Sequence, residues 1–154
     1  MGLIYLDACL VIYLAETHPQ WGAAVARAMA GAGEARFGLS PLVKCECLVG
    51  PLKRGDPVLQ RAYLDLFERF LPLAMPDEVY LEAAQLRARF GLKTSDALHL
   101  ATAQHYRCDA LWTNDDRLLQ ASHGLARNIL KEAGARDMTA GRGSAAATKK
   151  RNPK

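Results

Sequence analysis

Two carboxylates follow apolar segments that are typical of buried strands. Asp7 comes directly after the run 3–6, and Asp115 follows the run 110–112 after two polar residues. Such short runs without polar alternation suit strands covered on both faces, as in the centre of a parallel sheet. Because ligands of open α/β sheets bind at the carboxyl ends of the strands, we expect Asp7 and Asp115 to lie together at that edge.

Two further acids are expected on helices that begin near the same edge. Ser40-Pro41 combines an N-cap residue with proline at the first helical position, which predicts a helix start. Glu46 then falls on an apolar stripe of that helix, where a carboxylate is costly unless it meets a cation or donors. Asp96 lies in the first turn after a predicted N-cap, Thr94. The helix dipole favours an acid there in any case, so for Asp96 alone a structural role is the simpler explanation.

A cluster of these four acids would need protons, basic partners or metal ions, because close carboxylates repel one another. The basic residues nearest in sequence, Lys44, Lys93 and Arg117, are too few for ion pairs alone. Hard oxygen ligands favour one or two Mg²⁺ or Mn²⁺ ions, which commonly bridge protein carboxylates to a phosphate. The chemistry implied is phosphodiester hydrolysis. Lys93 and Arg117 could hold phosphate oxygens, although solvated side chains are the default for both.

The elements that must position these acids alternate between strands and helices. This alternation predicts a three-layer α/β/α fold with a central, mostly parallel sheet of about five strands. The expected strands lie near 3–6, 36–39, 71–75, 110–112 and 125–129. The expected helices lie near 8–16, 21–30, 41–49, 57–70, 76–90, 94–106 and 117–121.

Glycine and proline give three local expectations. Residues 50–55 are expected to form a turn. Pro72 makes its strand an edge strand, because proline cannot donate to a sheet ladder. Gly91 is a natural stop for the helix 76–90. The residues of that helix that we expect on one face are Leu81, Ala84, Gln85 and Ala88.

Composition and charge favour one domain followed by a basic tail. The chain has 154 residues, 50% of them hydrophobic, which suits a single core. Its net charge is +4, but residues 141–154 contain only basic charges, so the excess belongs to that end. We expect a nuclease-like domain over 1–136 and a disordered tail over 137–154, which could contact nucleic acid nonspecifically. The longest apolar run, 8–15, is too short to span a bilayer, so a soluble, cytoplasmic protein is expected.

The cysteines and histidines are expected to carry no chemistry. The cysteines lack the spacing of a zinc site or a disulfide framework, and small buried thiols in a reducing compartment are the simpler explanation. The histidines are expected to be packing or surface residues. The cysteines are Cys9, Cys45, Cys47 and Cys108, and the histidines are His18, His99, His105 and His123.

Four short segments, in this order, resemble the motifs of PIN-domain ribonucleases. The nearest group is the VapC-type toxin of bacterial toxin–antitoxin pairs, and the resemblance covers roughly residues 3–130. Each motif is weak alone, but four in the right order at suitable separations are fairly specific. The segments are Leu3-Ile4-Tyr5-Leu6-Asp7, Ser40-Pro41-Leu42-Val43-Lys44-Cys45-Glu46, Gly91 to Ala101 with Thr94-Ser95-Asp96-Ala97-Leu98-His99, and Leu111-Trp112-Thr113-Asn114-Asp115.

The resemblance implies a cytoplasmic endoribonuclease that cuts structured or single-stranded RNA with Mg²⁺, for which Mn²⁺ can substitute. By analogy, Asp7, Asp96 and Asp115 bind metal, Glu46 holds a metal-bound water or a second ion, and Thr113 orients the water. The family also implies a cognate antitoxin, whose C-terminal segment would cover the groove and whose basic residue could enter the acidic pocket. A homodimer through the helices of about 56–90 is implied as well.

Two departures from the family pattern leave alternatives open. Asp116 beside Asp115 makes the fourth acid ambiguous by one residue, with Asp115 favoured. Cys9 stands where the family often has a hydroxyl or amide residue. A Mg²⁺-dependent phosphomonoesterase also places an Asp after its first strand, but it usually has a second Asp two residues later, where Cys9 stands here. A non-catalytic module whose acids dock a partner's arginines is the third possibility.

Overall fold

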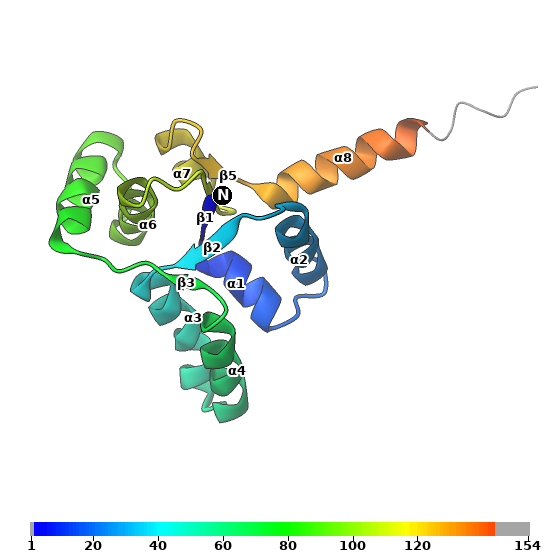
Figure 1. Ribbon diagram of the computed structural model, residues 1–154, viewed down its shortest axis with the longest axis horizontal. Coiled ribbons are helices and arrows are strands. Elements are labelled where there is room, and N and C mark those ends of the chain that lie inside the picture. The colour runs from blue at the N-terminus through cyan, green and yellow to red at the C-terminus, as the bar shows by residue number, and fades with distance from the viewer. Residues whose placement is uncertain (1, 144–154) are drawn as a thin grey trace, which may run out of the picture.

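A parallel sheet of five strands forms the centre of the described part of the chain, in the order β3-β2-β1-β4-β5 (Figure 1). The computed structural model describes the backbone of residues 2–143 and the side chains through residue 136. Helices cover both faces of the sheet, which confirms the expected three-layer α/β/α fold. The strands are β1 (Leu3–Leu6), β2 (Arg36–Leu39), β3 (Leu71–Pro72), β4 (Ala110–Trp112) and β5 (Ala126–Arg127). The helices are α1 (Ala8–Ala15), α2 (Gly22–Gly31), α3 (Pro41–Arg54), α4 (Pro57–Phe67), α5 (Asp77–Phe90), α6 (Thr94–His105), α7 (Asp116–Ala121) and α8 (Ile129–Gly143).

Strand β1 lies in the middle of the sheet, as its uninterrupted apolar sequence predicts. Ile4 is in register with Phe37 on β2 and with Ala110 on β4. Tyr5 and Leu6 are fully buried. Pro72 lies on β3 at the sheet edge, which confirms that prediction. The position of β1 places its end, and therefore Asp7, at the centre of the carboxyl edge.

The two faces of the sheet are covered by different helices, because side chains alternate along each strand. Tyr5 points towards α6, where its ring meets that of His99 at 5.7 Å. Ile4 and Trp112 face the opposite side and share a cavity wall with Ala28 of α2. Figure 1 shows α5 and α6 on one side of the sheet and α1 and α2 on the other. Residues that are adjacent in β1 therefore contribute to different layers.

Three helices begin where strands end, and a polar side chain caps each of them. Asp7 accepts a hydrogen bond from the backbone N–H of Ala8 at the start of α1. Ser40 caps α3 as its Ser-Pro sequence predicts, and Asp115 caps α7. The backbone N–H of Asp7 donates to the carbonyl of Trp112 at 3.0 Å, so the ends of β1 and β4 are paired. Two of the predicted acids are thus fixed by strand pairing and capping together.

Residues 50–54 are helical, so the predicted turn is wrong. Helix α3 continues through Pro51 to Arg54. Proline lacks an N–H, so Pro51 removes one hydrogen bond from the helix. The side chain of Pro51 is buried. The helix ends at Gly55, which adopts φ 58°, the left-handed conformation that glycine tolerates best.

Helix α5 buries a different face from the one we expected. Its buried residues are Val79, Ala83 and Leu86, which are also at helical spacing. Leu81 is 67% exposed, and the rest of the expected stripe is exposed too. Two stripes of residues on this helix have the same period, and the stripe that contains Val79 and Leu86 faces the core.

Helix α6 begins at Thr94 after the extended Lys93, without a side-chain cap, so Thr94 is not the N-cap.

Helix α8 was not expected from the sequence. It extends from Ile129 to Gly143, away from the body of the fold in Figure 1. The predicted domain boundary at residue 137 therefore falls inside a helix, and residues 144–154 of the expected tail lie outside the described part of the chain. Within residues 2–143, no helix combines the length and apolar character that crossing a bilayer requires.

The thiols fit a structural role with one exception. Cys47 and Cys108 are buried and Cys9 is half-buried, whereas Cys45 is exposed on the solvent side of α3. Burial raises the pKa of Cys9 and Cys47 to about 12 and that of Cys108 to about 11. These three side chains therefore stay protonated at neutral pH and behave as small apolar groups.

Candidate active site

Asp7 is held at the end of β1 by donors on both sides of its carboxylate. Its Oδ1 accepts from the backbone N–H of Ala8 at 2.7 Å, and its Oδ2 accepts from the hydroxyl of Thr113 at 2.6 Å. The Thr113 oxygen in turn accepts from the backbone N–H of Asp115 at 3.1 Å. Thr113 is fully buried, so this connection is shielded from water. It fixes Asp7 relative to the loop that carries Asp115.

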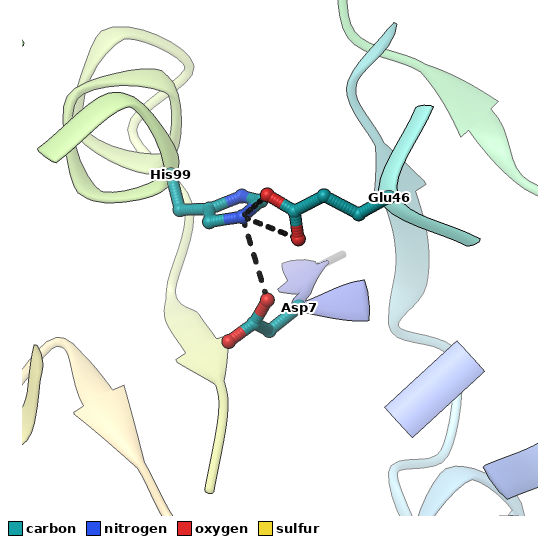
Figure 2. A group of neighbouring side chains, drawn as sticks. All are labelled: Asp7, Glu46 and His99. Carbon is teal, nitrogen blue, oxygen red and sulfur yellow. Dashed lines mark hydrogen bonds and ion pairs between the residues drawn. The ribbon is translucent and has the colours of Figure 1, made fainter. Parts of the chain in front are cut away.

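Glu46 meets Asp7 through the ring of His99. The Nε2 atom of His99 lies 3.0 and 3.3 Å from the two carboxylate oxygens of Glu46 and 3.5 Å from Oδ1 of Asp7. Figure 2 shows the three side chains pointing towards one another from β1, α3 and α6. One ligand atom from each lies within 4.8 Å of the others, a spacing that a metal ion could bridge. The costly position of Glu46 on its helix is thereby explained.

His99 was expected to be a packing or surface residue rather than a catalyst. It is only 2% exposed and packs against Tyr5, but its Nε2 atom also lies beside Asp7 and Glu46, which we did not predict from the sequence. The sequence did carry a signal for this position. His99 follows Asp96 by three residues on one helix, and residues three apart share a helix face. A histidine on the face of a predicted metal-binding acid was therefore a candidate for the pocket.

The second nitrogen of His99 is also paired. Its Nδ1 lies 2.7 Å from the hydroxyl of Tyr5, which lies 2.7 Å from Oγ of Ser40. Burial lowers the pKa of His99, but the hydrogen bond to Glu46 and the charges of Asp7 and Glu46 outweigh that effect and raise it. Burial raises the pKa of Tyr5 far above its ordinary value, so the phenol stays protonated.

Asp96 lies close enough to Asp115, Asp7 and His99 for their charges to act on it. Partial burial raises the pKa of Asp96, and the negative charges of Asp115 and Asp7 raise it further, whereas His99 and Lys93 act in the opposite direction. The negative charge of such a carboxyl group is only partly balanced by the positive groups around it. Asp7 and Glu46 thus meet at His99, and the charges of Asp115 and Asp7 both act on Asp96.

Asp116 points away from this cluster. Both of its oxygens accept hydrogen bonds from Nζ of Lys131, at 2.8 and 2.9 Å, and its side chain is 65% exposed. Asp115 is less exposed, and its Oδ1 accepts from the backbone N–H of Arg117. The arrangement favours Asp115 over Asp116 as the fourth acid.

The donor set fits a hard divalent cation. The pocket combines carboxylate oxygens from separate elements, and ion pairs in the described part of the chain involve Asp7 and Glu46 but neither Asp96 nor Asp115. A cation that binds carboxylates and keeps several waters, such as Mg²⁺ or Mn²⁺, would relieve the repulsion between them. Lys93 and Arg117 are exposed beside the acids, where a phosphate could reach them.

Comparisons with known proteins agree with this geometry. Residues 4–124 match the PIN domain family. The chain is 31% identical over 132 residues to "Ribonuclease VapC46" of Mycobacterium tuberculosis, an overlap of 84% of this chain and 98% of that protein. Both findings confirm the resemblance that the four motifs indicate.

Solved structures share the fold at lower identity. VapBC2 of Rickettsia felis, solved with a promoter DNA fragment, has a TM-score of 0.70 at 15% identity and covers 81% of this chain and 97% of its own. A toxin–antitoxin complex from Klebsiella pneumoniae has a TM-score of 0.68 at 21% identity, covering 84% and 98%. VapC20 of M. tuberculosis has a TM-score of 0.66 at 14% identity, covering 77% and 94%. The chain belongs to the PIN-domain family, in the group of the VapC proteins.

Proposed function

We propose that this protein is a Mg²⁺- or Mn²⁺-dependent endoribonuclease that acts as the toxin of a toxin–antitoxin pair. One observation carries the proposal. Asp7, Glu46, Asp96 and Asp115 come from four separate segments, and the raised pKa of Asp96 reflects the charges of Asp115 and Asp7. Perturbed carboxyl groups that come together from separate segments are typical of functional sites, which supports a bound cation here. Its relative VapC46 is named a ribonuclease, which supports RNA as the substrate.

The residues of the pocket have distinct proposed roles. Asp7, Asp96 and Asp115 would hold the cation, and Glu46 would hold a second ion or orient the attacking water. Such a cation supplies charge neutralisation at the phosphate and lowers the pKa of water. Thr113 already donates its only hydroxyl hydrogen to Asp7, so we assign it the orientation of Asp7 in place of the water-orienting role. Lys93 and Arg117 are proposed phosphate contacts.

The direct test is RNA hydrolysis by the purified protein. We expect cleavage with Mn²⁺ that is lost in excess EDTA and in Asp7→Ala and Asp96→Ala. Asp65→Ala is a matched control, because Asp65 is an exposed acid whose partner is Arg61 on the same helix. Circular dichroism checks that each variant is folded. Cleavage that persists in both pocket variants would refute the assignment.

The same assay separates the alternative functions. Hydrolysis of a phosphomonoester but not of RNA would favour a phosphomonoesterase. Cys9 argues against that class, because burial and the charge of Asp7 raise its pKa to about 12, and a protonated thiol cannot replace the second carboxylate. A protein whose thermal stability and activity ignore divalent ions would instead be a partner-binding module.

Partners of the protein are also part of the proposal. A structure of similar fold solved as a toxin–antitoxin complex supports an antitoxin partner, whose C-terminal segment we expect to cover the acids. We also propose a homodimer formed through the helices of about 56–90, which are α4 and α5, and a cytoplasmic location, where RNA is available. Light scattering at several concentrations would detect the dimer, and co-expression with a candidate antitoxin would test that partner. The large apolar side chains exposed on α4 and α5 are Val58, Leu64, Tyr80 and Leu81.

A further inference from the structure

A buried line of hydrogen bonds leads from the start of α3 to the acidic pocket. It connects Ser40, Tyr5, His99 and Glu46 through contacts of 2.7, 2.7 and 3.0 Å. The first three residues are at most 2% exposed. We propose that Ser40, Tyr5 and His99 are positioning residues that set the geometry of Glu46 and Asp7 for the cation. This inference rests on the proposed function and extends it to residues that lie behind the proposed metal-binding acids.

Each member of this line shares an element with one of the acids. Tyr5 precedes Asp7 by two residues on β1, His99 follows Asp96 by three on α6, and Ser40 caps the helix that carries Glu46. The hydrogen bonds therefore join the three elements whose relative placement determines the distances between those acids. A shift of any one element would break a buried hydrogen bond, which is costly because no water replaces it.

The hydrogen-bond directions follow from the chemistry of the groups. Ser40 accepts from the backbone N–H of Val43, and its own hydroxyl can donate to Tyr5. The Tyr5 hydroxyl then donates to Nδ1 of His99, which leaves the ring hydrogen on Nε2, facing Glu46. A bare Nε2 lone pair would face the oxygens of both Glu46 and Asp7 and be repelled. If the ring carries two hydrogens, Nε2 still donates to Glu46, so the contact persists in either state.

The Tyr5 hydroxyl is the most informative group in this line. A phenylalanine would fill the same space in the core, and a hydroxyl is costly to bury unless it is hydrogen-bonded. Both neighbours of the Tyr5 hydroxyl belong to the line, so removing it disconnects His99 from Ser40 without opening a large cavity. Partners of this kind, one step removed from metal ligands, commonly change metal affinity when they are lost.

The test compares two tyrosines that are buried to the same extent. Tyr5 and Tyr63 are both fully buried, and the Tyr63 hydroxyl donates to Glu16 at 2.6 Å, outside the pocket. We expect Tyr5→Phe and Tyr63→Phe to lower the thermal midpoint by comparable amounts. Only Tyr5→Phe should weaken Mn²⁺ binding, by about 10-fold, as measured from the electron paramagnetic resonance signal of free Mn²⁺ in a titration.

Substitution of His99 gives a second, independent readout. The side-chain amide of glutamine can place an N–H near the position of Nε2, so His99→Gln should retain more Mn²⁺ affinity than His99→Ala.

Saturating Mn²⁺ should restore most of the RNA cleavage rate of Tyr5→Phe, because the acids themselves are intact. This rescue would not occur if Tyr5 acted directly on the reaction.

The possible failures point to different conclusions. If the parent protein binds Mn²⁺ and Tyr5→Phe binds it equally well, the positioning role is overturned and the proposed function stands. Equal losses of Mn²⁺ affinity in Tyr5→Phe and Tyr63→Phe would also overturn it, because the effect would then be one of general stability. If the parent protein binds no Mn²⁺, both the positioning role and the metal-dependent function fail.

Discussion

The two halves of the acidic pocket differ in how the fold treats a carboxylate. Asp7 and Glu46 have internal partners, namely the backbone N–H of Ala8, the Thr113 hydroxyl and the His99 ring. Asp96 has instead a raised pKa, caused by burial and by the charges of Asp115 and Asp7. The first half is held in place before any ligand arrives. Asp96 keeps an unfavourable charge that His99 and Lys93 compensate only in part, and an added cation would compensate it further.

This difference separates preorganisation from binding energy. Partners such as Thr113 and His99 fix where ligand atoms stand, which reduces what a cation must rearrange on binding. The repulsion felt by Asp96 is relieved when the cation enters, so it adds to the preference for the bound state. A site built only from acids with internal partners, such as Asp7 and Glu46, would bind a cation less strongly. A site built only from repelled acids, such as Asp96, would lack defined geometry.

The largest expected effect distinguishes Asp115 from its neighbour Asp116, which is paired with Lys131 away from the other acids. Asp115→Asn should lower the rate of RNA cleavage by roughly 100-fold or more, because a lost metal ligand removes several kcal/mol of charge stabilisation. Asp116→Asn is the matched control. Its partner is Lys131, at 2.8 Å outside the pocket, so cleavage should change less than about twofold. The reverse ranking of the two rates would move the fourth ligand to Asp116.

A second expected effect concerns the coupling of cation binding to stability. Mn²⁺ at about 100 times its dissociation constant should stabilise the parent protein by about 2.7 kcal/mol. Asp96→Asn should remove most of that gain, and urea unfolding with and without Mn²⁺ measures it. Without metal, the same substitution should stabilise the protein by up to about 1 kcal/mol at neutral pH, because a partly exposed repelled charge is removed. A metal-free Asp96→Asn that is less stable than the parent would contradict the proposed repulsion.

Local rules in the sequence predict the positions of two of the acids, Asp7 and Glu46. An apolar run ending in Asp7, and Ser40-Pro41 before Glu46, fix a strand end and a helix start without reference to the rest of the fold. The right-handed parallel topology then brings these positions to one edge. Asp96 needed the resemblance, because a first-turn acid is common without function.

The features that the sequence did not reveal depend on contacts between distant segments. The role of His99 depends on Tyr5 and Glu46, which lie 94 and 53 positions away in the chain. Pro51 continues a helix because it is buried, and α5 turns Val79 rather than Leu81 inward because of what it packs against. For α5 the two stripes have the same helical period, and for Pro51 local propensity favours a turn, so in both cases the local sequence does not decide the outcome.

The third prediction uses pH to separate the two halves in the absence of metal. The pKa of His99 is higher in the folded protein than its ordinary 6.5. Protonated His99 therefore stabilises the fold fully below pH 6.5, and this stabilisation is lost as the pH rises through the raised pKa. Asp96 acts in the acid range. As the pH falls through its raised pKa towards the ordinary 3.8, protonation of Asp96 relieves the repulsion and stabilises the folded protein. Urea unfolding at a series of pH values should therefore show a decline in stability above 6.5 that His99→Gln removes. Asp96→Asn should remove the stability gain on acidification and raise stability at neutral pH, and it should also lessen the decline above 6.5, because the charge of Asp96 helps to raise the pKa of His99.

The smallest expected effect lies outside both halves. Removing residues 144–154 deletes Lys149, Lys150, Arg151 and Lys154 and no acid. Because each phosphate contact contributes about 0.7 to the slope of log affinity against log salt for single strands, the truncated protein should bind RNA more weakly at low salt and with a flatter salt dependence. Cleavage at saturating RNA should be unchanged, since the acids remain. A truncated protein that binds RNA normally but cleaves it slowly would mean that this segment acts on the pocket itself, and the division into a preorganised and a cation-compensated half would then be incomplete.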